Sequence, residues 1–185
     1  MIVGTLILNP TKQNIISLGK GKFDFILLDF QHSAFTWETA DYVIETVYTY
    51  TDKKIWIRVA NNNFSDINRA YDIGADAVVV PLINTMNDLK NCINAARYKP
   101  LGNRSWGPVR LRENYRSYED YFINAHSKQF LFPQIESLQG LNNLSEMCTL
   151  DGWDGVMIGP SDLAISMGEV PNFPPKSQLV KDKME

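Results

Sequence analysis

The sequence has few cysteines, no excess of basic residues and no long apolar run, and each shortage excludes a class of protein. Its two cysteines, Cys92 and Cys148, lie far apart in predicted helices. We expect free thiols rather than a disulfide or metal ligands, as in a reducing cytoplasm. A net charge of −3 offers no basic surface for a nucleic acid. No apolar run is long enough for a membrane-spanning helix, and residues 1–10 do not resemble a signal peptide.

Motifs for nucleotide and zinc binding are also missing from the sequence. It contains no glycine-rich GxGxxG loop, no Walker-type phosphate loop and no Cys/His set at zinc spacing. A nucleotide cofactor is therefore not indicated. No predicted strand ends in a lysine, so nothing points to Schiff-base chemistry.

Strand-like and helix-like segments alternate along the chain, the pattern of βα units in a parallel sheet. The expected strands cover residues 3–8, 23–28, 54–59 and 77–80, a stretch beginning at 130, and residues 155–158. The expected helices cover residues 11–20, 36–50, 66–73, 86–97, 118–127 and 138–147, with a short helical turn to about 167. Thr36 is a plausible N-cap and Gly74 a plausible C-terminal glycine. A long loop is expected over 99–116.

With 185 residues, 44% hydrophobic and 21% charged, the chain fits one soluble globular domain. We predict an α/β fold, a TIM-type (β/α)8 barrel that is incomplete, over residues 1–170, followed by an irregular polar tail over 171–185. A closed barrel of this type normally takes about 250 residues, so the chain is about two βα units short. It forms an open barrel, borrows strands from another chain, or is a truncated product.

Polar side chains collect at the carboxyl ends of the predicted strands, which is where β/α barrels carry their chemistry. They are Asp29 and His32 after the second strand, Arg58 near the end of the third, Gln134 and Glu136 after the fifth, and Asp162 after the sixth. A random scatter would not gather a base, a cation and carboxylates on one rim. The chain therefore reads as an enzyme.

Glu136 and Asp162 are the candidate metal ligands. Carboxylate oxygens suit hard cations such as Mg²⁺, which keeps water molecules that a substrate can displace. The alternative is that either acid is a solvated loop residue or forms a structural ion pair. Glu136 favours the metal reading, because an unpaired carboxylate directly on an apolar strand would be costly.

Arg58 and His32 are the candidate catalytic side chains. Arg58 is flanked by apolar residues, and its planar donors suit a carboxylate or a developing enolate oxygen; a salt bridge to a neighbouring acid is the alternative. His32 has Asp29 nearby to orient it, as a general base would need, although a lone histidine is more often an ordinary loop residue. His126, at a predicted helix end, is expected to interact with the helix dipole.

The Gly159-Pro160-Ser161 turn is a candidate carboxylate site, since backbone N–H groups in such a turn can hold an anion. The turn is too short to be specific by itself. Its interest comes from its place directly before Asp162.

Several separated blocks give the chain a resemblance to the HpcH/HpaI family of class II pyruvate-dependent aldolases, as far as about Gly168. Residues 23–32 are similar to a strand block that ends Asp-x-Glu-His in the family, and residues 57–59 to its Val-Arg-Val strand. Residues 72–75 with 79–81 are similar to its Asp-x-Gly-Ala and Val-Pro blocks, and residues 97–104 to an Arg-Tyr-x-Pro-x-Gly-x-Arg loop. Residues 134–136 and 158–163 are similar to its metal-ligand blocks.

This resemblance implies a lyase that cleaves 4-hydroxy-2-oxo acids, such as 2-dehydro-3-deoxyglucarate, to pyruvate and an aldehyde. It implies Mg²⁺, Mn²⁺ or Co²⁺ on Glu136 and Asp162, with Arg58 stabilising the enolate. His32 would transfer the proton, supported by Asp29 and Asp72. Substrate contacts would come from Gln134, Gly159, Pro160 and Ser161. The family also implies a homo-oligomer, a trimer or a hexamer.

Two departures from the family pattern leave other readings open. Gln31 stands where the family has an acid before the histidine, which removes a charge beside the proposed base. The last two strands and the C-terminal helix of the family have no counterpart. An inactive truncated paralogue therefore remains an alternative, as does a citrate-lyase-β-like or phosphoenolpyruvate-mutase-like member of the wider superfamily.

Overall fold

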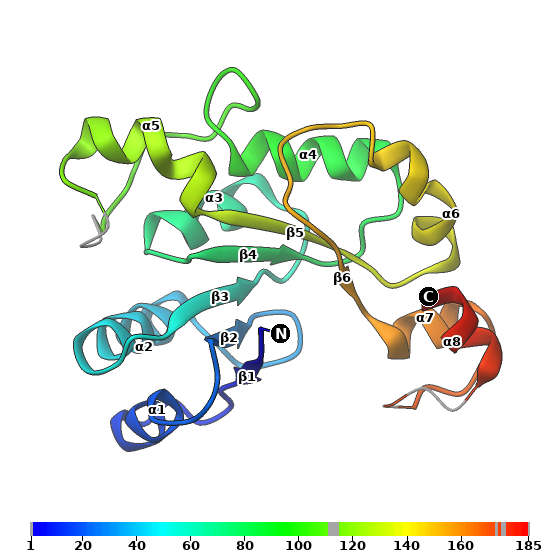
Figure 1. Ribbon diagram of the computed structural model, residues 1–185, viewed down its shortest axis with the longest axis horizontal. Coiled ribbons are helices and arrows are strands. Elements are labelled where there is room, and N and C mark those ends of the chain that lie inside the picture. The colour runs from blue at the N-terminus through cyan, green and yellow to red at the C-terminus, as the bar shows by residue number, and fades with distance from the viewer. Residues whose placement is uncertain (1, 111–114, 173, 175–176, 185) are drawn as a thin grey trace.

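The protein is built on a parallel sheet of six strands in chain order, shown in Figure 1. The computed structural model describes residues 2–110, 115–172, 174 and 177–184. Its strands are β1 (Gly4–Leu6), β2 (Phe25–Asp29), β3 (Lys54–Arg58), β4 (Ala77–Val80), β5 (Phe130–Ile135) and β6 (Met157–Ile158). β1 and β6 are edge strands, so within these residues the sheet curls without closing. The prediction of an incomplete α/β barrel with six βα-type strands is confirmed.

Helices alternate with the strands and begin at well-defined caps. They are α1 (Lys12–Gly19), α2 (Trp37–Tyr50), α3 (Phe64–Asp72), α4 (Met86–Ala96), α5 (Tyr118–Lys128), α6 (Leu138–Met147), α7 (Pro160–Ser166) and α8 (Gln178–Met184). The first six are each preceded by a Thr, Asn or Ser whose side chain accepts a first-turn N–H. Thr36 caps α2 as predicted, and Gly74 follows α3 at φ 109°, where glycine costs least.

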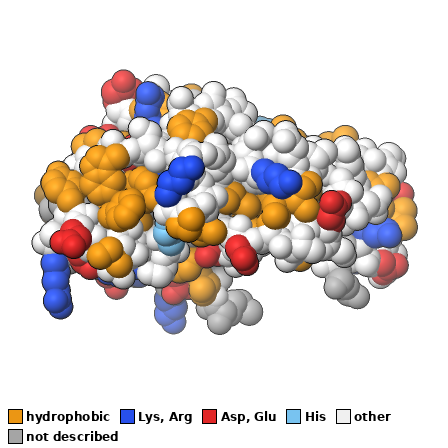
Figure 2. All heavy atoms as spheres, turned by 90° about the horizontal axis from the view of Figure 1, so that it is seen from above, with side chains coloured by type: hydrophobic (Ala, Val, Ile, Leu, Met, Phe, Trp, Pro, Cys, Tyr) orange, Lys and Arg blue, Asp and Glu red, His pale blue; other side chains and the backbone are white. Residues whose placement is uncertain are grey.

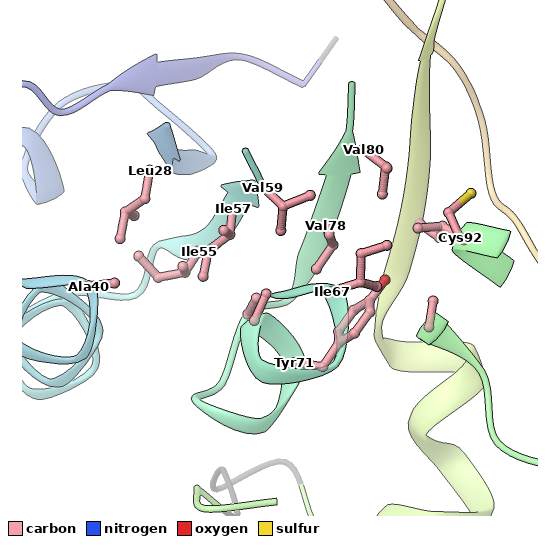
Figure 3. Close-up of a cluster of buried hydrophobic side chains, with 14 of the residues drawn as sticks. Leu28, Ala40, Ile55, Ile57, Val59, Ile67, Tyr71, Val78, Val80 and Cys92 are labelled. Atoms are coloured by element: carbon pink, nitrogen blue, oxygen red, sulfur yellow. The ribbon is translucent and has the colours of Figure 1, made fainter. Parts of the chain in front are cut away.

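The main core lies between the outer face of the sheet and the helices, and Figure 3 shows part of it. Alternate strand residues point to this face, because successive side chains of a strand lie on opposite sides. Ile55 and Ile57 of β3 and Val78 of β4 are fully buried there. Each such side chain contributes about 1.5–3 kcal/mol by its burial. The layer fixes the strands and therefore the positions of their carboxyl ends.

The inner, concave face carries an aromatic stack near the amino ends of the strands. The Phe25 and Trp56 rings are 3.9 Å apart and nearly parallel, and Trp56 stacks on Phe132 at 4.7 Å. Residues two further along the same strands, such as Arg58 and Gln134, lie on the same face. The stack thus forms an apolar floor beneath the polar rim.

The structure differs from the sequence prediction mainly at the ends of elements and in the tail. β6 is two residues long, and α3 begins at Phe64 rather than at 66. The tail expected to be irregular contains helix α8, whose Val180 is buried against Leu163 and Ala164 of α7. Residues 99–110, 115 and 116 of the expected long loop form no helix or strand, and 111–114 lie outside the described residues.

The surface, the cysteines and the helix lengths provide further observations. Hydrophobic side chains gather at the end of the molecule covered by α5 (Figure 2), where Trp106, Tyr118 and Phe122 are each about half exposed. Both cysteines are free thiols, with Cys92 buried and Cys148 exposed. No helix in the described part of the chain is both long and apolar enough to span a membrane.

Candidate active site

A cleft of about 400 Å³ lies at the carboxyl ends of the strands, where the sequence predicted the site. It is lined by His32, Arg58, Gln134, Met157, Ile158, Gly159, Pro160, Ser161 and Asp162. The structure therefore brings together most of the predicted site residues. The parallel sheet explains this arrangement, because it aligns the carboxyl ends of all its strands on one edge.

Arg58 and Asp29 form an ion pair across neighbouring strands. They lie opposite each other in the β2–β3 register, and Arg58 Nε and Nη2 donate to the two Asp29 oxygens at 2.8 and 2.6 Å. Burial alone would raise the pKa of Asp29. The Arg58 bonds and the backbone N–H groups of Gln31 and His32 outweigh burial, and the pKa is lowered. The salt-bridge alternative considered for Arg58 is thus present, while its Nη1 still donates to Gln134 Oε1 at 3.4 Å in the cleft.

The prediction that Asp29 orients the His32 side chain needs correction. Asp29 receives the His32 backbone N–H at 3.4 Å, but both its carboxylate oxygens are engaged by Arg58. In the described part of the chain no hydrogen bond joins the imidazole to Asp29. Asp29 therefore positions Arg58, and His32 reaches the cleft as an exposed side chain without that support.

Glu136 is buried, with 2% of its surface exposed, and its carboxylate is held by neutral donors. Its Oε1 accepts the backbone N–H of Leu82 at 2.8 Å, and its Oε2 accepts from Gln134 Nε2. No ion pair among the described residues involves Glu136. A buried carboxylate without a cation is costly, and a bound cation would offset that cost.

The donor set fits a hard divalent cation that keeps open positions. Asp162 is exposed in the first turn of α7, and Gly159 three residues before it lies against Glu136. Within the described residues no group of three or more His, Cys, Asp or Glu side chains is arranged so that it could hold a metal ion. Two carboxylates would therefore leave the remaining positions of a six-coordinate ion to water and substrate oxygens.

In the Gly159-Pro160-Ser161 turn, one of the N–H groups predicted to bind a substrate carboxylate has another partner. The Gly159 N–H was expected to be free for a substrate, but it donates to Ile135 O at 3.1 Å and extends the β5–β6 pairing. Pro160 has no N–H. The Ser161 N–H can still contact an anion, because N–H groups in the first turn lack an acceptor within the helix.

Gly159 is required because Glu136 packs directly against its backbone. A Cβ at this position would lie 2.6 Å from Glu136 Oε2 and 2.7 Å from Glu136 Cβ. Gly159→Ala is expected to displace the carboxylate and weaken Mn²⁺ binding by about 10-fold or more, within the range found when groups around metal ligands are changed. Gly155→Ala is the control, since its Cβ would meet only the Phe132 ring, at 3.1 Å. Equal Mn²⁺ affinities in a calorimetric titration would contradict the geometry.

Two predicted catalytic residues do not line the cleft: Asp29 borders it through its ion pair with Arg58, whereas Asp72 lies away from it. Asp72 ends α3, which runs back from the rim, and lies near the amino end of the sheet. Its carboxylate accepts from Arg104 Nη2 at 2.8 Å and from Asn68 Nδ2 at 2.7 Å. Burial raises the pKa of Asp72 more than these two partners lower it. Within this chain it anchors the 97–110 loop and has no contact with His32.

Sequence reasoning missed the contribution of the turn after β4. Leu82 has a φ of 59°, and its N–H reaches Glu136. The preceding Pro81 signalled the end of a strand, but a left-handed leucine leaves no mark in a sequence. No residue type would have indicated this donor.

The chain is similar to known proteins over most of its length. The family model described as HpcH/HpaI aldolase/citrate lyase matches residues 9–173. A 2-keto-3-deoxy-L-rhamnonate aldolase of Klebsiella pneumoniae is 33% identical over 147 residues, covering 79% of this chain and 55% of that protein. A 4-hydroxy-2-oxo-heptane-1,7-dioate aldolase of Salmonella dublin is 29% identical over 147 residues, covering 79% and 56%.

A solved structure has the same fold. The HpcH/HpaI aldolase of Desulfitobacterium hafniense superposes with a TM-score of 0.85 at 20% identity, covering 98% of this chain and 71% of that one. The chain spans about half the length of the curated relatives above.

Proposed function

The chain belongs to the HpcH/HpaI aldolase/citrate lyase family, and we propose that it is a divalent-metal-dependent lyase of the class II aldolase type. Its reaction is the reversible cleavage of 4-hydroxy-2-oxo acids, such as 2-dehydro-3-deoxyglucarate, to pyruvate and an aldehyde. The observation that carries the proposal is the buried Glu136 carboxylate, which lies against the Gly159 that lines the cleft and forms no ion pair with any described residue. The aldolase names of its relatives support the lyase class.

Glu136 and Asp162 would hold the ion, which is Mg²⁺, Mn²⁺ or Co²⁺. A divalent ion there supplies Lewis-acid polarisation of the 2-oxo group of the substrate. The protein adds a rigid ligand in Glu136, whose two oxygens are already oriented by the Leu82 and Gln134 donors. Preorganised ligands need no rearrangement when substrate arrives.

Arg58 would stabilise the negative charge that develops on the keto oxygen as the carbon–carbon bond breaks. Its guanidinium is fixed by Asp29 on one side, and Nη1 faces the cleft beside Gln134. A positioned donor of this kind acts mainly on the transition state. Gln134 links Arg58 to Glu136 and orients both.

His32 would move the proton of the aldol hydroxyl. It is exposed at the mouth of the cleft and makes no ion pair among the described residues. An imidazole within reach of the substrate can act as a general acid or base. The Ser161 turn would bind the substrate carboxylate, and a homo-oligomer, trimeric or hexameric, is the expected assembly.

Pyruvate release tests the proposal. The protein is incubated with 2-dehydro-3-deoxyglucarate and Mg²⁺, Mn²⁺ or Co²⁺, and pyruvate is measured through lactate dehydrogenase. We expect metal-dependent pyruvate formation that stops with a chelator. Unchanged release in the chelated sample would contradict metal dependence, and no release of pyruvate from any 4-hydroxy-2-oxo acid would contradict the aldolase assignment.

A further inference from the structure

The turn between β4 and α4 is bonded to the segment that carries the candidate metal ligand at three successive residues. Leu82 N–H donates to Glu136 Oε1 at 2.8 Å, and Ile83 N–H donates to Gln134 O at 3.2 Å. The Asn84 side-chain oxygen then accepts the Ser137 hydroxyl. Three successive residues of the turn are thus each bonded to a different residue of segment 134–137.

Leu82 adopts an unfavourable backbone conformation in this turn. It is the one non-glycine residue in the described part of the chain with a positive φ, 59°. Its side chain is 56% exposed, so side-chain packing does not explain the conformation. A strained residue of this kind persists only where its surroundings hold it. Here the conformation aims the N–H at Glu136.

Asn84 is the residue through which the turn is held. Its side-chain Nδ2 donates to Leu82 O at 3.1 Å, and its backbone oxygen accepts Asn143 Nδ2 from α6 at 2.7 Å. Its backbone N–H donates to Asp88 at 3.2 Å. These bonds tie the turn to α4 and α6, and the link to Ser137 ties it to the residue directly after Glu136.

Ser137 has two roles at this point. Its hydroxyl oxygen accepts the Gly140 N–H at 3.0 Å as the N-cap of α6, and the hydroxyl donates to Asn84. We propose that Ser137 and Asn84 are positioning residues that lock the Leu82 N–H against Glu136 and so set the direction of its metal-binding lone pairs. This inference rests on the proposed metal-dependent function.

Ser137→Ala and Ser117→Ala form a matched pair of test variants. Ser117 caps α5 in the same way, accepting the Asp120 N–H at 3.1 Å, away from the cleft. Both variants lose an N-cap, so both melting temperatures should fall, and Ser137→Ala also loses the bond to Asn84. Only Ser137→Ala is expected to weaken Mn²⁺ binding, by about 10-fold, as loss of an outer partner of a metal ligand typically does. Ser137→Thr, which keeps the hydroxyl, should restore the affinity.

Asn84→Ala is the second variant, because it leaves the α6 cap intact. It should weaken Mn²⁺ binding by the same factor as Ser137→Ala, and the double variant should be no weaker, since the two residues act as one unit. Wild-type affinity in Asn84→Ala, or equal affinity in the Ser137 and Ser117 variants, would overturn the inference alone. A folded wild-type protein that binds no Mn²⁺ would overturn the proposed function as well.

Discussion

Glutamine in place of Glu136 is expected to abolish most of the affinity for Mn²⁺ while leaving the protein folded. The substitution keeps the side-chain length and an oxygen for the Leu82 N–H, but it removes the charge that a cation needs. The loss should exceed about 100-fold, the upper end for outer partners of metal ligands. Isothermal titration with Mn²⁺ measures it.

Glu136→Gln should also affect the stability of the metal-free protein. Glu136 is a buried carboxylate whose hydrogen bonds with the described residues come from neutral donors. Removing an uncompensated buried charge should leave the melting temperature of the metal-free protein unchanged or higher. Glu146→Gln, at an exposed position on α6, is the matched control and should change neither quantity. Wild-type Mn²⁺ affinity in Glu136→Gln would remove Glu136 from the ligand set.

Arg58→Ala is expected to lower turnover by about 10²–10³-fold, the usual effect of removing a donor from a developing negative charge. Mn²⁺ affinity should change little, because Arg58 contacts Gln134 and not Glu136. The variant should also be less stable, since it leaves Asp29 buried without its partner. Breaking a fully buried pair costs about 3–5 kcal/mol. The Arg58 side chain is 17% exposed at an open cleft, so a smaller loss is expected here.

A double variant separates these two effects of Arg58. The double variant Arg58→Ala, Asp29→Asn has no unpaired carboxylate at position 29. The side-chain oxygen of the asparagine can still accept the Gln31 N–H. We expect the melting temperature to recover and turnover to stay low. Recovery of both would show that Arg58 acts only by holding the fold, and it would remove Arg58 from the mechanism.

The barrel architecture could be predicted from the sequence because its signals are local. β-branched and aromatic runs at regular intervals indicated the strands, and Thr36 indicated the start of one helix. The position of the site could be predicted from the parallel topology, because polar residues that follow several parallel strands must lie on the same edge of the sheet. His32, Arg58, Gln134 and Asp162 all line one cleft for that reason.

The partners within the rim could not be predicted, because they depend on the strand register. Asp29 lies three residues from His32 in sequence, yet the β2–β3 register places it opposite Arg58. A role for Asp72 beside His32 was implied by the family resemblance alone, and its carboxylate is bonded to Arg104 and Asn68 instead. The Leu82 contact depends on a single backbone angle.

The most direct test of the central claim is exchange of the pyruvate methyl protons with D₂O, followed by proton NMR. It tests the proposed metal and enolate chemistry by itself, because no aldehyde takes part. The account predicts exchange that depends on Mg²⁺, Mn²⁺ or Co²⁺, stops with a chelator and is absent in Glu136→Gln. A folded, metal-bound protein that gives no exchange would contradict it and would favour an inactive paralogue.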